Sequence, residues 1–118
     1  MKIPLSANNN DKATTGVAAR NQALENSIRA AKKGDWEARH HIERNLMPLL
    51  KKLAEKRSDN TATFNRMIEA GKSGIAIAIR KVPANIPGDR FQIFALPFIE
   101  EAMDKSGRKS IWQRLFGS

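Results

Sequence analysis

The chain has 118 residues, which is enough for one domain with one modest hydrophobic core. Its hydrophobic fraction of 41% and negative mean hydropathy are typical of a folded soluble protein, and no apolar run is long enough to span a bilayer. Lysine and arginine outnumber aspartate and glutamate by 21 to 12, and the resulting net charge of +9 favours a polyanionic partner. The absence of cysteine excludes disulfides, thiolate nucleophiles and Cys-ligated zinc.

Residues 1–20 are rich in Asn, Thr, Ala and Gly and show no sustained apolar period. They also lack the apolar segment of a secretory signal, which suits a cytoplasmic protein. We therefore interpret these residues as a flexible N-terminal arm.

Apolar residues at helical spacing follow the arm and predict a helix from Asn21 to Gly34. Asp35 is suited to cap the next helix, because its carboxylate can accept hydrogen bonds from the free amides of the first turn. Pro48 stands inside that second apolar pattern and should kink or split the helix. A polar loop at residues 58–63 ends it.

The segment from Phe64 to Val82 has apolar residues three, four or seven apart, as on one side of a helix. Gly71 and Gly74 weaken that helix, however, and isoleucines alternate along residues 75–79 as they would in a strand. The pattern alone therefore leaves this segment open between helix and strand.

A predicted turn at residues 83–88 precedes a helical stripe from Phe91 to Met103, which continues through Pro97. A break is expected at Gly107. The predicted organisation is an arm at residues 1–20, a helical domain at residues 21–104 and a short amphipathic tail at residues 105–118.

No catalytic or metal-binding arrangement emerges from the sequence. His40 and His41 are adjacent, and neighbouring helical positions point about 100° apart, so one metal ion cannot easily use both. The Gly-Lys-Ser sequence at residues 71–73 resembles the end of a phosphate-binding loop, but Arg66 stands where that motif requires a glycine. We therefore expect no enzymatic activity, no cofactor and no metal.

Residues 71–74, Gly-Lys-Ser-Gly, also match the GXXG loop of a KH domain, whose backbone clamps single-stranded RNA. A KH domain needs three strands, and only residues 75–82 are a candidate for one. A KH-like, non-specific RNA- or DNA-binding module is one alternative.

Three segments in order along the chain carry a more extensive resemblance. Residues 34–38 have a Gly-Asp-x-x-Ala opening, and residues 45–54 form an apolar helix with a proline before an apolar pair. Residues 64–82 keep a characteristic spacing of glycine and apolar positions at Met67, Ile68, Gly71, Gly74, Ile75, Ala78, Ile79 and Val82. Together with an aromatic segment at residues 89–99, they resemble region 2 of the sigma-70 family of bacterial RNA polymerase sigma factors. The resemblance extends over residues 45–103, about half of the chain.

This resemblance implies an all-α fold, a small helical bundle like sigma region 2, and favours helix for residues 75–82. It also implies that residues 64–82 face the coiled coil of the polymerase's largest subunit. The partner-binding residues on this interpretation are Phe64, Arg66, Glu69, Ala70 and Lys72.

The resemblance further implies that the aromatic segment after residue 90 faces the promoter −10 element, where aromatic rings stack on flipped bases. Basic clusters on helix surfaces would add attraction to any nucleic acid. The predicted nucleic-acid-binding residues are Lys51, Lys52, Lys56 and Arg57 from one basic cluster, and Arg90, Phe91, Phe94 and Phe98 from the aromatic segment.

Several positions depart from the sigma-family pattern. Arg66 and Ala70 replace acids that pair with basic residues of the polymerase, and Glu100 and Glu101 replace an Arg-Gln pair. These departures favour a sigma mimic or adaptor that binds an anti-sigma factor or another regulator without reading DNA. The net charge of +9 instead favours a sigma-like protein that binds core RNA polymerase or promoter DNA, or the nucleic-acid-binding module. No membrane partner is expected, and no oligomeric state is predicted.

Overall fold

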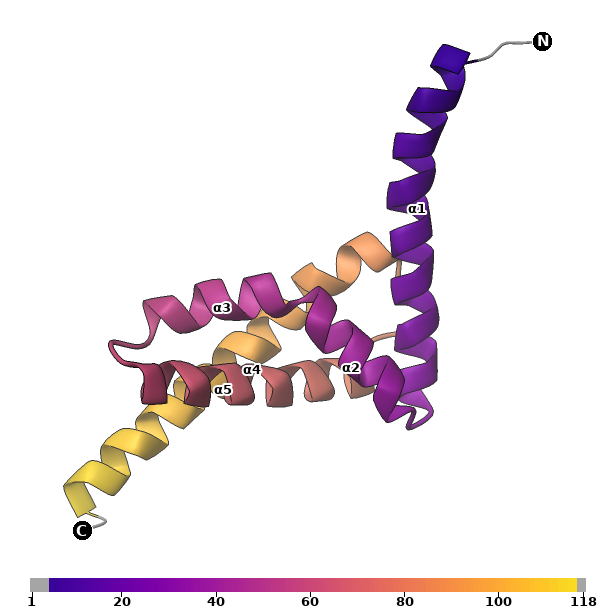
Figure 1. Ribbon diagram of the computed structural model, residues 1–118. Coiled ribbons are helices and arrows are strands. Elements are labelled where there is room, and N and C mark those ends of the chain that lie inside the picture. Colours follow the sequence, from indigo (N-terminus) through magenta and orange to yellow (C-terminus); the bar gives the residue numbers. More distant parts are fainter. Residues whose placement is uncertain (1–4, 117–118) are drawn as a thin grey trace.

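The computed structural model describes the backbone of residues 5–116 and the side chains of residues 16–107. Throughout that part of the chain the regular structure is helical, which confirms the predicted all-α class and helix for residues 75–81, while Val82 is the C-cap of that helix. The elements are α1 (Leu5–Lys32), α2 (Trp36–Asn45), α3 (Met47–Lys56), α4 (Thr61–Lys81) and α5 (Gly88–Phe116). Figure 1 shows α3, α4 and α5 packed together, with α1 standing across the end at which α2 begins.

Helix α1 begins at Leu5, whereas the sequence pattern predicted a helix only from Asn21. The added segment combines alanines, which favour a helix, with Asn, Thr and Gly residues, which do not, so its sequence did not indicate the helix. The helix boundary is therefore corrected, and the flexibility of residues 1–20 stays a prediction.

The turn between α1 and α2 uses the residues expected of it. Gly34 has a φ of 100°, which a residue with a side chain rarely adopts. Asp35 then caps α2, accepting hydrogen bonds from the amides of Glu37 at 3.0 Å and Ala38 at 3.2 Å. The predicted cap is confirmed.

Helix α2 ends at Asn45 and α3 begins at Met47, so Pro48 lies in the first turn of α3. A proline is tolerated there because the amides of the first turn have no partner within the helix. The predicted split of this region into two helices is confirmed.

Gly71 and Gly74 lie where α4 crosses its neighbours and do not interrupt the helix. A Cβ atom at Gly74 would stand 2.6 Å from both the carbonyl oxygen of Phe98 and the Cα of Ile99 in α5. One at Gly71 would meet the side-chain ends of Leu50 at 2.5 Å and Met103 at 2.9 Å. The glycines therefore permit close packing, which offsets their low helix propensity.

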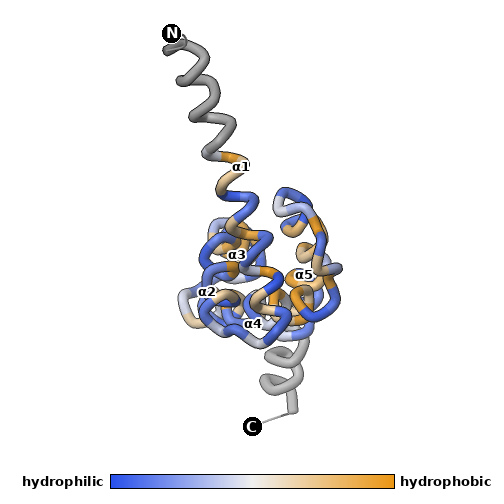
Figure 2. The backbone as a smooth tube through the Cα atoms, turned by 90° about the vertical axis from the view of Figure 1, so that its right-hand side faces the viewer, coloured by the Kyte–Doolittle hydropathy of each residue, from blue (hydrophilic) through white to orange (hydrophobic). Residues whose placement is uncertain are grey.

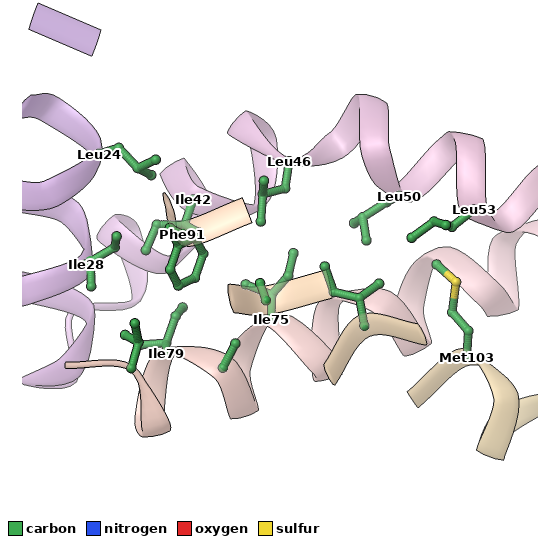
Figure 3. Packing of buried hydrophobic residues seen from close by; sticks show 14 of the residues in the cluster. Leu24, Ile28, Ile42, Leu46, Leu50, Leu53, Ile75, Ile79, Phe91 and Met103 are labelled. Atoms are coloured by element: carbon green, nitrogen blue, oxygen red, sulfur yellow. The ribbon is translucent and has the colours of Figure 1, made fainter. Parts of the chain in front are cut away.

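The core is one cluster of buried aliphatic side chains that surrounds Phe91 at one end and Met103 at the other (Figure 3). Every described helix contributes to it, and hydrophobic and hydrophilic positions alternate along the helices as amphipathic packing requires (Figure 2). Its buried members are Leu24, Ile28, Ile42, Leu46, Leu50, Leu53, Ala54, Met67, Ile75, Ala78, Ile79, Val82, Phe91, Ala95, Ile99 and Met103.

Helix α5 continues through Gly107 to Phe116, so the predicted break at Gly107 is absent from the backbone. A single glycine costs a helix only about 1 kcal/mol relative to alanine, which flanking residues with good helix propensity can offset. The helix also contains Pro97 without ending there. Among the described residues, no helix combines the length and the hydrophobicity that crossing a membrane requires.

Lys32, at the end of α1, holds the C-terminus of α4. Its Nζ donates hydrogen bonds to the carbonyl oxygens of Ile79 at 3.1 Å, Arg80 at 3.2 Å and Val82 at 2.6 Å. A cation is favourable there, because the last carbonyls of a helix lack backbone partners and carry partial negative charge. Lys32 thus joins α1 to the end of α4.

The N-terminus of α5 is held to α1 in a complementary way. Glu25 Oε2 accepts a hydrogen bond of 2.8 Å from the amide of Gly88. A Cβ atom at Gly88 would stand 2.6 Å from the carbonyl oxygen of Asn21, so only glycine allows this approach. Two side chains of α1 thus fix it across the bundle: Glu25 binds the N-terminus of α5, and Lys32 binds the C-terminus of α4.

Candidate binding surfaces

The five residues predicted to bind a protein partner all lie on α4 but do not share one face. Arg66 and Glu69 are exposed, whereas Phe64 and Ala70 are partly buried and pack against the core. Lys72 is partly buried and its Nζ lies 3.2 Å from Glu69 Oε2. The exposed side of α4 therefore presents Arg66 and the Glu69–Lys72 ion pair.

An open hollow of about 330 Å³ lies between this side of α4 and α2. Its lining residues are Arg39, His40 and Glu43 of α2 and Glu69, Lys72, Ser73 and Ala76 of α4.

Glu43 is the one buried charged residue among the described side chains. Its carboxylate oxygens lie 3.8 Å from Arg39 Nε and 3.4 Å from His40 Nδ1. Since a buried charge is costly without partners, these contacts account for its position. Glu43 is therefore already engaged by residues of its own helix.

Trp36 is a feature of α2 that the sequence analysis did not assign to a site. Its side chain is 64% exposed, and its ring meets the ring of His40 edge-on with centroids 5.4 Å apart. A second hollow beside it is lined by Trp36, Glu37, His40 and Arg44. His40 lines both hollows, so the two adjoin at that residue. The sequence feature that could have indicated this site is a tryptophan directly after the Asp35 helix cap and outside the apolar stripe.

Three of the predicted nucleic-acid-binding residues lie on the outer side of α3. Lys51, Lys52 and Lys56 are exposed, because the same helix buries Leu50 and Leu53. These three lysines are thus available to an external anion.

Arg57 has a different environment from those lysines. Its Nε lies 3.0 Å from Asp104 Oδ1 and its Nη2 lies 3.6 Å from Glu100 Oε2, and its side chain is 23% exposed. These contacts join α3 to α5. The prediction that Arg57 binds nucleic acid does not fit this engagement, and we leave the residue out of the candidate surfaces.

The aromatic segment of α5 is divided between core and surface. Phe91 is fully buried, so in this fold its ring cannot stack on a base and the prediction for it is corrected. Phe94 and Phe98 are partly buried and contact each other, with ring centroids 5.4 Å apart. Arg90 is exposed. The three rings are spaced three and four apart along one side of the helix, so their different burial follows from which elements cover each part of α5.

The acids of this segment are engaged within the chain. Glu100 lies near Arg57, as described, and Glu101 Oε1 lies 3.2 Å from Lys105 Nζ. Their charges are therefore partly balanced by neighbouring cations. They provide less repulsion toward a nucleic acid than the sequence alone suggested.

The GXXG sequence at residues 71–74 lies in the middle of α4, with both glycines buried. A KH domain would place this sequence in an exposed loop beside strands, and residues 5–116 contain no strand. The KH alternative therefore does not fit this fold. Within the described part of the chain, no group of three or more His, Cys, Asp or Glu residues is arranged to hold a metal ion.

Comparison of the chain with protein-family models, with curated proteins and with solved structures finds no match.

Proposed function

We propose that this chain is a sigma-like binding protein of bacterial transcription that docks on core RNA polymerase through the exposed side of α4. The observation that carries this proposal is the two-sided character of α4. Its buried side consists of the glycine and apolar positions on which the resemblance to sigma region 2 rests: Met67, Gly71, Gly74, Ile75, Ala78 and Ile79. Its other side leaves Arg66 and Glu69 exposed.

A helix fixed along one side and open along the other is suited to docking, because its exposed side chains are already positioned before the partner arrives. The sigma resemblance assigns this side of the helix to the polymerase coiled coil. Arg66 and Ala70 replace acids there, so we expect weak docking in which a like-charge contact opposes association.

Promoter reading is a smaller part of this proposal. It would rest on Phe94 and Phe98, whose rings are partly buried against the core. We therefore expect docking on a protein, and not sequence recognition, to be the main activity of α4 and α5.

A sigma mimic that binds an anti-sigma factor is the alternative, and exposed Arg66 is the observation that favours it. Glu100 and Glu101 no longer favour it, because both lie beside cations of the same chain.

The test is the affinity of the full chain for purified bacterial core RNA polymerase. Replacing Arg66→Asp together with Ala70→Glu restores acids at both positions and should strengthen binding about tenfold. A matched control, Arg20→Asp with Ala23→Glu, makes the same chemical changes at exposed positions of α1 and should leave binding unchanged.

Two results would overturn the proposal. One is an absence of binding to core polymerase by both the unmodified chain and the Arg66/Ala70 variant. The other is an equal gain from the control pair, which would show that net charge alone governs the interaction. Binding to a purified anti-sigma factor, without binding to core, would replace the proposal with the sigma mimic.

A further inference from the structure

Trp36 is a large apolar side chain that the fold does not use. It is 64% exposed and does not belong to the hydrophobic core or to the residues packed against it. Its ring contacts only His40 among the described aromatic pairs. Most of the indole surface is therefore open to a ligand.

The exposed charges along α2 and α3 are mostly basic, although Glu37 lies next to Trp36. Along α2 and α3, exposed cations outnumber exposed carboxylates by five to two, and the remaining acid, Glu43, is buried between Arg39 and His40. The cations are Arg39, Arg44, Lys51, Lys52 and Lys56, and the exposed acids are Glu37 and Glu55.

These residues are exposed on two consecutive helices, α2 and α3. Trp36, His40 and Arg44 are spaced four apart, so they form one stripe along α2. Helix α3 follows directly, and its lysines lie on the side away from the buried Leu50. Figure 1 shows α2 leading into α3 along one side of the molecule. A tryptophan thus lies at the start of an extended basic surface.

We propose that this outer surface of α2 and α3 binds single-stranded nucleic acid, with one base stacked on Trp36 and the backbone phosphates on Arg44 and the α3 lysines. Every base offers a flat π-face to an indole, and a basic surface beside it tracks the phosphates without reading sequence. An unpaired strand is required, because a base within a duplex is already stacked on both sides. The proposal is independent of polymerase docking, since it uses a different pair of helices.

An anionic membrane is the other partner that tryptophan and lysine can favour. An interfacial helix, however, must bury a broad apolar face in the bilayer. The apolar sides of α2 and α3 are buried in the core, and the neighbours of Trp36 on the outside are Glu37, His40 and Arg44. The surface therefore fits a nucleic acid and not a lipid surface.

The experiment begins with Trp112→Phe, which leaves Trp36 as the only tryptophan of the full chain. We expect its fluorescence to be quenched in a saturable way by short oligo(dT) and oligo(U), with affinity falling steeply as salt rises. The two oligonucleotides distinguish a DNA from an RNA preference. A duplex of the same length should bind more weakly.

Variants then separate stacking from charge, with binding measured by the anisotropy of labelled oligo(dT). Trp36→Ala should weaken binding about tenfold, and Trp36→Phe should restore most of the loss because it keeps a π-face. Val17→Ala, a truncation of another exposed apolar residue, should have no effect.

Lys51→Ala with Lys52→Ala should lower the salt dependence of binding, whereas Arg80→Ala with Lys81→Ala should change it less.

The proposal fails if oligonucleotides bind without quenching Trp36, if Trp36→Ala binds as well as the unmodified chain, or if the duplex binds as tightly as the single strand. It also fails if anionic phosphatidylserine vesicles bind the chain and oligonucleotides do not. Far-UV circular dichroism of each variant checks that it is folded, so that a loss of binding is not caused by unfolding.

Discussion

The packed interface of α4 with α5 and the outer surface of α2 and α3 contrast in burial: the first encloses its side chains, whereas the second leaves a large aromatic ring exposed. At the crossing, the backbones approach so closely that Gly74 has no room for a Cβ atom, and Phe91, in the first turn of the same α5 helix, is fully buried. On the outer surface, Trp36 is largely exposed beside charged side chains. One aromatic ring is therefore required for folding, while the other is available for binding.

This difference matters because the same substitution should have separate consequences in the two regions. Truncation at the crossing leaves a cavity that the packed helices cannot close. Truncation on the outer surface removes contacts mainly with water. Stability measurements can therefore distinguish structural from functional aromatic residues in this chain.

The largest effect is expected from Phe91→Ala. Its ring is fully buried within the cluster that joins α1, α2, α4 and α5 (Figure 3). Removing it should lower the free energy of unfolding by about 3–5 kcal/mol, through lost burial and the cavity left behind. Urea denaturation followed by circular dichroism measures this change. A loss below about 1 kcal/mol would mean that the ring is not part of the core.

The next effect concerns the glycine at the crossing. Gly74→Ala should lower the free energy of unfolding by about 2 kcal/mol, because the new methyl group would strike the backbone of Phe98 and Ile99. Gly107→Ala is the matched control, since nothing lies within 4 Å of the added atom and the residue is helical. The control should gain up to about 1 kcal/mol from helix propensity. Changes of the same sign in urea denaturation would contradict the packing assigned to Gly74.

A smaller effect is expected where α1 meets the end of α4. Lys32→Met keeps the length of the side chain but removes three hydrogen bonds to carbonyl oxygens. The free energy of unfolding should fall by about 1–2 kcal/mol. Lys33→Met changes the exposed neighbour and should cost less in the same urea titration. Equal losses for the two variants would show that the loss of one positive charge, and not the contact with α4, is responsible.

The sequence predicted much of the fold because local rules decide those parts. Asp35 caps a helix wherever it precedes one, and Pro48 limits a helix through its own ring. The ends of α1 and α5 were predicted less well. Apolar periodicity did not indicate the N-terminal part of α1, whose apolar residues follow no regular period. The break expected from Gly107 overstated the effect of one glycine, which the surrounding helix tolerates.

The binding surfaces were less predictable, since they depend on which side of each helix is covered. Arg57 and Lys51 lie in one basic cluster, yet only Arg57 lies beside acids of α5, which are 43 and 47 positions further along the chain. Phe91 and Phe94 belong to one aromatic segment, yet only Phe91 is fully buried. Such differences follow from tertiary packing, which a list of residue types does not contain.

The smallest stability effect is expected at Trp36, although tryptophan is the largest side chain of the protein. Trp36→Ala removes a ring that is mostly exposed and lies outside the core, so the free energy of unfolding should change by no more than about 0.5 kcal/mol. The same urea titration used for Phe91→Ala gives the comparison directly. Loss of single-strand binding at unchanged stability would assign the indole to recognition. A loss of stability near that of Phe91→Ala would instead mean that Trp36 is covered in solution, which would remove the premise of the proposed nucleic-acid surface.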